Sequence, residues 1–280
     1  MIRHSITEKQ NRQMARIPIN GYRKTALILT SLILLLSFTS LFWVPDNTAM
    51  DSQKRFLPPG KSHLLGTDNF GRDVFYRVMA GSRHTITLAI CVVAAAAVLG
   101  SMLGLCAGYT GGIADEAIMR LMDAISSFPG ILFALAMTAI LGNSQFTLFA
   151  ALLILFIPGF TRIIRSGALQ YKNADFIVAE RLLGASRARI IFIHILPNLA
   201  PPLFSAAALG LSNAILAESA MSYLGLGVQP PLPSWGRMLS ESQNFLINAP
   251  WCAIAPGACI MLTVIVFHCL GDSLSRRMER

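Results

Sequence analysis

Long apolar stretches separated by short polar segments dominate the pattern of this chain. A helix needs about 20 apolar residues to cross the hydrocarbon core of a bilayer. The alternation typical of membrane β-barrel strands is absent from the sequence, so helices are the spanning structure that remains. The pattern therefore predicts an all-α, polytopic membrane helical bundle with six transmembrane helices, at residues 25–44, 84–109, 118–141, from the turn 142–145 to near Pro158, 199–224 and 251–271.

The composition leads to the same class. Hydrophobic residues make up 54% of the chain and charged residues 13%, and the mean hydropathy is +0.58, which is far from the range of soluble domains. Six crossings place both termini on one side, and the basic residues near each terminus favour the cytoplasm. The predicted segments are a cytoplasmic arm 1–24, the first span 25–44, an external polar segment 45–83, a five-helix core 84–271 with a cytoplasmic loop 166–198, and a cytoplasmic tail 272–280.

One polar, basic island interrupts the apolar pattern between Arg165 and Asn198. Within it, residues 176–183 predict a short helix, with Asn173 or Asp175 as its N-cap and Gly184 as its stop. Two interpretations stay open from the residues alone. The helix is either a docking surface for a protein in the water phase or an amphipathic segment that rests on lipid headgroups.

Several other polar or small residues in the spans are interpreted as structural. Gly100, Gly104 and Gly108, four apart, predict close packing of the second span against another helix. Arg120 and Asp123 are expected to form a local ion pair. Glu218 lies inside the fifth span, where an unpaired carboxylate is costly and often functional, but the resemblance given below, to the motif that begins at Ser222, favours a structural hydrogen-bonding role. The five cysteines show no paired spacing, so no metal or catalytic set is predicted.

Three ordered motifs resemble the permease subunits of ABC-type importers, in the dipeptide, oligopeptide and nickel branch. The first is His63-Leu64-Leu65-Gly66-Thr67-Asp68, which continues through Gly71-Arg72-Asp73 to Arg77 and Gly81-x-Arg83. The second lies in the island, where Ala179, Gly184, Leu196 and Pro197 fall on that family's loop pattern and Val178, Glu180 and His194 depart from it. The third is Ser222-Tyr223-Leu224-Gly225-Leu226-Gly227, followed by Gln229-Pro230-Pro231 and Trp235-Gly236. The resemblance extends over most of the chain beyond the N-terminal arm.

The resemblance implies a type I ABC importer permease in a bacterial inner membrane, which works with a second homologous permease, two cytoplasmic ATPases and an external solute-binding protein. It implies no nucleic-acid partner. The chain has no Gly-x-x-x-x-Gly-Lys-Ser/Thr phosphate-binding loop, so it is expected not to be an enzyme, to need no cofactor of its own and to leave ATP to its partners. The residues that the resemblance assigns to ATPase coupling are Phe176, Val178, Ala179, Glu180, Leu183, Gly184, Ala185 and Ser186.

Two other functional classes predict different features. A self-sufficient secondary transporter is expected to show paired ionisable groups at midspan and related halves, and neither is visible in the sequence. A channel is expected to show polar rings along a pore. For an importer, short peptides are the first expected substrate and nickel or metal chelates the second.

Overall fold

The computed structural model of the chain describes residues 50–278, and every regular element in this part is a helix. The strand-like pairing in the described residues is limited to one isolated bridge between Thr67 and Asp73. The predicted arm 1–24 and the predicted span 25–44 lie outside the described residues. The all-α class predicted from the sequence is confirmed.

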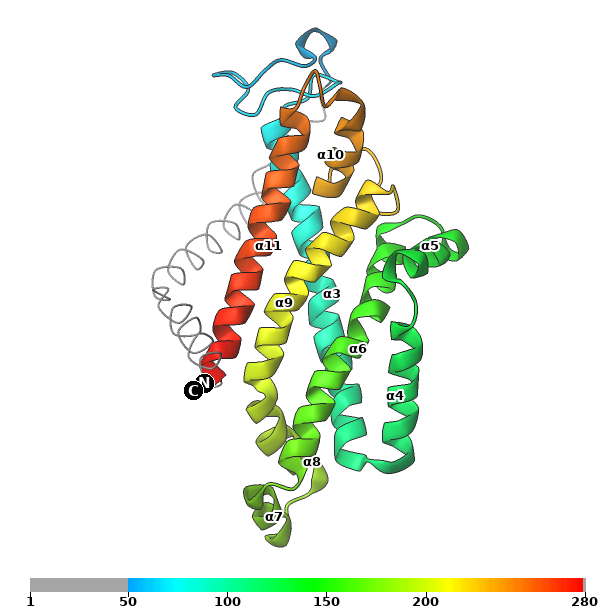
Figure 1. Cartoon of the computed structure of the whole chain (residues 1–280), viewed down its shortest axis with the longest axis vertical. Coiled ribbons are helices and arrows are strands. Elements are labelled where there is room, and N and C mark those ends of the chain that lie inside the picture. Colours follow the sequence, from blue (N-terminus) through cyan, green and yellow to red (C-terminus); the bar gives the residue numbers. More distant parts are fainter. Residues whose placement is uncertain (1–49, 279–280) are drawn as a thin grey trace, which may run out of the picture.

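Four long helices run side by side and form the body of the bundle (Figure 1). Each is long and apolar enough to cross a membrane. They are α3 (Val74–Thr110), α6 (Gln145–Lys172), α9 (Leu196–Tyr223) and α11 (Trp251–Met278).

The shorter elements lie around these four helices. They are η1 (Ser52–Lys54), α4 (Gly112–Ser126), α5 (Gly130–Leu141), α7 (Asp175–Leu182), α8 (Arg187–Arg189), η2 (Ile190–Ile195), α10 (Trp235–Ser242) and η3 (Gln243–Phe245). Helix α10 lies at one end of the bundle and α7 at the opposite end, here called the α10 end and the α7 end (Figure 1). Helix α11 begins near the α10 end and runs toward the α7 end, so the island and the C-terminal part of α11 point the same way (Figure 1).

Helix α3 begins ten residues before the predicted span at His84. Asp73 is its N-cap, because the backbone N–H of Phe75 donates to the Asp73 carboxylate at 2.8 Å. At 37 residues the helix is about 55 Å long, while the hydrocarbon core is about 30 Å thick. Helix α3 therefore extends well beyond any span that it makes.

The three glycines of α3 lie against α6, as predicted. An added Cβ would come within 2.6 Å of the Phe160 Cβ at Gly100, within 2.6 Å of the Thr161 carbonyl oxygen at Gly104, and within 2.8 Å of the Ala168 Cβ at Gly108. These distances are too short for any side chain. The predicted packing role of the glycines is confirmed, and their contact partner is α6.

The third predicted span is not one straight helix. Helices α4 and α5 meet at an angle of 88° across the break at Ser127, Phe128 and Pro129. Pro129 disfavours the helical conformation at Phe128, and it has no N–H to continue the hydrogen-bond ladder. The span predicted over 118–141 is therefore not one continuous helix, and the bent pair is either a broken span or a re-entrant segment.

The predicted Arg120–Asp123 ion pair is also wrong. Arg120 instead pairs with Glu116 one helical turn earlier, at 2.5 Å. Asp123 accepts a hydrogen bond from Arg162 of α6 at 2.8 Å. The arginine on the facing helix reaches Asp123, while Arg120 finds a carboxylate at the favourable i, i+4 spacing.

Two helices continue past their predicted ends. Helix α6 passes through Pro158 and Gly159 to Lys172, because Phe160, Ile164 and Ala168 still bury one face of it. The fifth predicted span starts near 199, but helical turns run without a break from Arg187 to Tyr223. Pro197 therefore lies inside a continuous helix and does not begin it. Within this run, η2 is a π-helix, and the N–H of Leu196 donates to the carbonyl of Ile191.

Candidate functional site

Helix α7 is a small projection at the α7 end, held between the end of α6 and the start of the next long helix (Figure 1). Ile177 is its anchor, since it is fully buried. It packs in a cluster that includes Ile164 of α6 and Ile190 and Ile195 of η2. One apolar side chain thus fixes the short helix to both of the helices that flank it.

The N-terminus of α7 is not capped as predicted. Ala174 occupies the N-cap position without a side-chain hydrogen bond, Asn173 is the C-cap of α6, and Asp175 is already in the first turn. Only one residue separates Asn173 from α7, so Asn173 serves the end of α6 instead. Asp175 still stabilises the helix, because a negative charge in the first turn interacts favourably with the positive end of the helix dipole.

Helix α7 stops before Gly184, as predicted, and Gly184 has a φ of +83°. The N–H of Gly184 donates to the Arg181 carbonyl at 3.1 Å, and the N–H of Ala185 donates to the Glu180 carbonyl at 3.0 Å. These two bonds form a Schellman motif, which requires the left-handed conformation that glycine adopts at low cost. Ser186 then caps α8, because its Oγ accepts a hydrogen bond from the N–H of Arg189 at 3.3 Å.

Most of the predicted coupling residues are exposed. Leu183 is 83% exposed, Phe176 44% and Val178 42%, and Ala179, Gly184 and Ser186 are exposed as well. Glu180 and Ala185 are half-buried, and the Glu180 carboxylate lies 3.6 Å from the imidazole of His194. Glu180 and Ala185 therefore face the bundle. Six of the eight share an outward surface.

Leu182 was missed as a site residue. It is 84% exposed and lies beside Leu183, so two leucine side chains project together at the tip of α7. The signal in the sequence was the Leu-Leu pair directly before the predicted helix stop. Two adjacent, nearly fully exposed leucines at the end of a bundle indicate a surface that another protein or a membrane covers.

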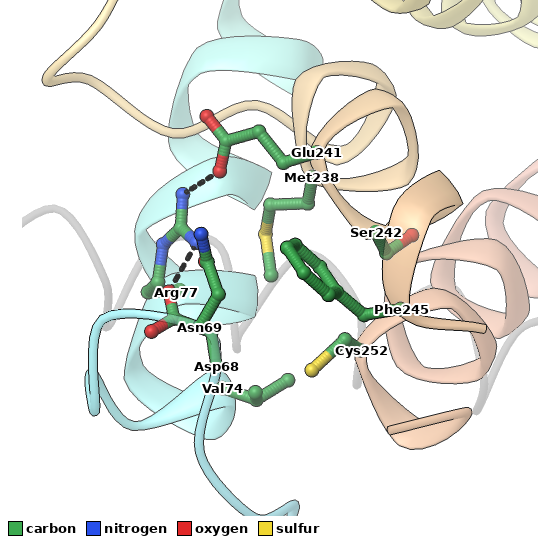
Figure 2. Close-up of a pocket in the computed structure, with 9 residues that line it drawn as sticks. All are labelled: Asp68, Asn69, Val74, Arg77, Met238, Glu241, Ser242, Phe245 and Cys252. Atoms are coloured by element: carbon green, nitrogen blue, oxygen red, sulfur yellow. Dashed lines mark hydrogen bonds and ion pairs between the residues drawn. The ribbon is translucent and has the colours of Figure 1, made fainter. Parts of the chain in front are cut away.

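A buried ionic cluster lies at the α10 end and joins the first motif to α10. Figure 2 shows the guanidinium of Arg77 between two carboxylates, with Nη1 2.6 Å from Asp68 and Nη2 2.9 Å from Glu241. Arg72 also donates to Asp68, at 2.7 Å. Asp68, Arg72 and Arg77 are all buried. Glu241 was not singled out in the sequence, since only the fold brings α10 to this point.

The cluster is a structural joint, not a ligand pocket. The space between its residues and the neighbouring Met238 and Phe245 has a volume of about 10 Å³, enough for no more than about one water molecule. At its exposed edge, the pKa of Asp51 lies below its ordinary value, because the Lys54 ammonium and the Gln53 N–H both donate to the carboxylate.

Glu218 is fully buried in α9, close to α10. Its carboxylate accepts hydrogen bonds from the hydroxyls of Ser222 at 2.6 Å and Ser219 at 3.4 Å. These bonds support the predicted structural role of Glu218.

A groove of ligand size lies between α3 and the N-terminal part of α6. Its volume is about 380 Å³, within the range of small-molecule sites. Arg83, His84 and Gln145 provide its polar groups, and Phe146 and Phe149 its aromatic ones. Arg83 is exposed and has no ion-pair partner in the described part of the chain, unlike Arg72 and Arg77.

The comparisons with known proteins decide the family. Residues 100–280 match the family described as the binding-protein-dependent transport system inner membrane component. The dipeptide transport system permease protein DppC of Alkalihalophilus pseudofirmus is 41% identical over 253 residues, which cover 90% of this chain and 83% of that protein. This chain belongs to that family of inner membrane permeases.

Other permeases of the family are similar over the same length. The probable D,D-dipeptide transport system permease protein DdpC of Escherichia coli is 38% identical, and the alignment covers 89% of this chain and 84% of that protein. The glutathione transport system permease protein GsiD of Pectobacterium atrosepticum is 36% identical, with 92% and 87% covered. The chain is thus an ABC importer permease, and the family that the sequence motifs resemble is confirmed.

A solved structure shows the same fold. A chain of the MetNI methionine ABC transporter, in an inward-facing conformation, superposes with a TM-score of 0.60 at 18% identity. The match covers 74% of this permease and 98% of that chain.

Proposed function

We propose that this permease is one of two membrane subunits of an ATP-driven importer of short peptides. The names of its relatives support the substrate class, because they are permeases of dipeptide, D,D-dipeptide and glutathione transport systems. A binding protein delivers the peptide at the α10 end, and the α7 end and both termini face the cytoplasm. The partners are a second homologous permease, two ABC ATPases and the external binding protein.

The exposed tip of α7 carries the proposal for ATPase coupling. The side chains of Leu182 and Leu183 are nearly fully exposed, and burying one leucine side chain against a partner contributes about 1.5–3 kcal/mol to binding. Leu183 is one of the eight predicted coupling residues, and the other seven lie in or next to α7. An ATPase surface with an apolar cleft is the occupant that this shape and chemistry fit.

The attachment of α7 makes it suited to transmit movement. Ile177 fixes it to the cluster shared by α6 and η2, and the hydrogen bonds around Gly184 stop it from fraying. Movement of the ATPases against α7 would therefore shift α6 and the helix from Arg187 to Tyr223 together. The chemistry of ATP hydrolysis belongs to the partner subunits.

The groove at Arg83 is the proposed point of contact with the peptide. A free peptide ends in a carboxylate, and Arg83 is an exposed guanidinium with no carboxylate of its own nearby in the described residues. Phe146 and Phe149 can contact an apolar side chain.

Co-purification and uptake test the proposal together. The tagged chain is isolated from its native membrane in mild detergent, and associated proteins are identified by mass spectrometry. We expect a second permease and ABC ATPases, and the complex in vesicles, supplied with the binding protein, should take up labelled dipeptides only with ATP. Uptake of nickel and of a nickel chelate is measured in parallel to decide between the two substrate classes.

A matched pair of variants tests the role of α7. Leu182→Gln together with Leu183→Gln should remove the ATPases from the purified complex and leave the thermal unfolding of the chain unchanged. Leu64→Gln is the control, because Leu64 is also exposed, at 64%, but belongs to the segment before α3, which lies at the α10 end (Figure 1). If the chain purifies alone and transports peptide without ATP, the secondary-transporter alternative replaces this proposal.

A further inference from the structure

Two arginines of α6 hold α4 in place. The guanidinium of Arg165 forms a two-pronged contact with Asp115, with Nε 2.5 Å from Oδ1 and Nη2 2.7 Å from Oδ2. Arg162 donates to Asp123 at 2.8 Å and to the hydroxyl of Ser126 at 3.0 Å. The order of the partners fits two antiparallel helices, since the later arginine meets the earlier aspartate.

Helix α4 has little else to attach it. Met122 is its only buried residue in the structure as described, whereas Ile113 is 87% exposed and Leu121 57%. Its link to α3 is the turn at Gly111 and Gly112, both with positive φ, a conformation that favours glycine. The ion pairs with α6 are therefore the principal polar attachment of α4 to the bundle.

The pair at Arg165 is better placed than a surface salt bridge. The Asp115 side chain is 16% exposed and that of Arg165 31%, and the geometry is bidentate. The backbone of Arg165 also lies against Gly104 and Gly108 of α3, where an added Cβ would come within about 3 Å of it. Helices α3, α4 and α6 thus meet at this one arginine.

Helix α6 leads directly to α7, since only Asn173 and Ala174 separate the two helices. We propose that the Arg165–Asp115 and Arg162–Asp123 pairs make α4 follow α6, so that movement of α7 reaches the bent pair α4 and α5 as well as the long helices. The inference rests on the proposed function. It makes these four side chains positioning residues for energy coupling, where the sequence had indicated only basic charge for the two arginines and a different partner for Asp123.

Functional assays of the assembled importer in vesicles test this role. Asp115→Asn with Asp123→Asn should leave ATP hydrolysis in place but lower the peptide transported per ATP about tenfold, within the usual range of coupling between sites. Asp115→Arg alone should also lower this ratio, and the added change Arg165→Asp should restore most of the transport lost in that single variant. Glu116→Gln is the control, because the Glu116–Arg120 pair lies within α4 and is exposed.

A distance measurement makes the test independent of variant folding. Spin labels are placed at the exposed Leu121 of α4 and Ile163 of α6, in an otherwise cysteine-free complex that retains uptake. With both ion pairs intact, the distance between the two labels should be the same with and without nucleotide. In the variant with Asp115→Asn and Asp123→Asn, the distribution of this distance should broaden or shift.

Either of two results overturns the inference. One is a label distance that changes between nucleotide states while the pairs are intact. The other is a double variant that still transports as much peptide per ATP as the unaltered complex. If the purified complex contains no ATPases, that result contradicts the proposed function itself and not only this inference.

Discussion

The indole Nε1 of Trp235 donates a hydrogen bond to the carbonyl oxygen of Val78 at 2.9 Å, across 157 residues of sequence. This bond joins the start of α10 to the first turns of α3. The Trp235 side chain is buried, and so is Gly81 on the adjacent turn of α3, against which the indole ring packs. Two motifs that looked independent in the sequence therefore form one joint.

Trp235→Phe tests that joint. The substitution removes this hydrogen bond and part of the buried ring that packs on Gly81, and loss of the bond alone should lower the free energy of unfolding by about 0.5–1.5 kcal/mol. Thermal unfolding in detergent measures it. Tyr223→Phe is the control, since Tyr223 is 40% exposed and its hydroxyl has no hydrogen bond within the described residues. Equal unfolding temperatures for the two variants would contradict the importance of the bond.

Asp68→Asn tests the buried cluster at the α10 end. It leaves Arg72 and Arg77 with less negative charge beside them, and breaking a buried pair in this way costs about 3–5 kcal/mol. We expect low yields of folded chain and a lower unfolding temperature. Asp51→Asn, which affects an exposed pair with Lys54, should behave like the unaltered protein. Similar stability of the two variants would show that Glu241 alone satisfies the arginines.

Gly184→Ala tests the end of α7. No atom lies within 4 Å of the Cβ position, so the cost is that of the left-handed backbone alone, about 1 kcal/mol. We expect faster proteolysis near this turn and weaker retention of the ATPases. Gly159→Ala is the matched control, since its Cβ position is also open but its helical backbone suits alanine. Gly184→Asn should keep most of the function, since asparagine tolerates this conformation.

Arg83→Gln tests the groove between α3 and α6. If Arg83 binds the peptide carboxylate, the substitution should raise the KM for dipeptide uptake about tenfold or more, a loss of about 1.4 kcal/mol in binding, with little change in kcat. The unaltered importer should also prefer a dipeptide to its C-terminal amide, and the variant should not. Lys61→Gln removes a charge outside the groove and is the control. An unchanged preference for the free carboxylate would exclude this contact.

The sequence predicted the parts of the fold that depend on local pattern. Apolar stretches of sufficient length marked the long helices, the spacing of Gly100, Gly104 and Gly108 predicted a close contact, and Gly184 marked the end of α7. Each of these signals acts within a few residues of its position. The spacing could not name α6 as the partner of the glycines, because that depends on the tertiary arrangement.

Two prolines show where local pattern fails. Pro129 breaks a predicted span by 88°, yet Pro158 lies inside the continuous helix α6. Pro158 is followed by residues that still bury one face against α3, while Pro129 is followed by α5, which buries only Ala134. The partners of Asp123 and Asp68 were out of reach for the same reason. Arg162 comes near Asp123, and Glu241 comes near Arg77 beside Asp68, only after the helices have packed.

The unbroken run of helix from Arg187 to Tyr223 has a mechanical consequence. Its 37 residues make a strut of about 55 Å, which begins beside α7 and ends beside α10. If this helix rotates as a rigid body by about 10° about one end, its other end moves by about 10 Å. Opening and closing at the far mouth of the bundle can therefore follow from a small rotation at the near one, without any change in the length or folding of the helix.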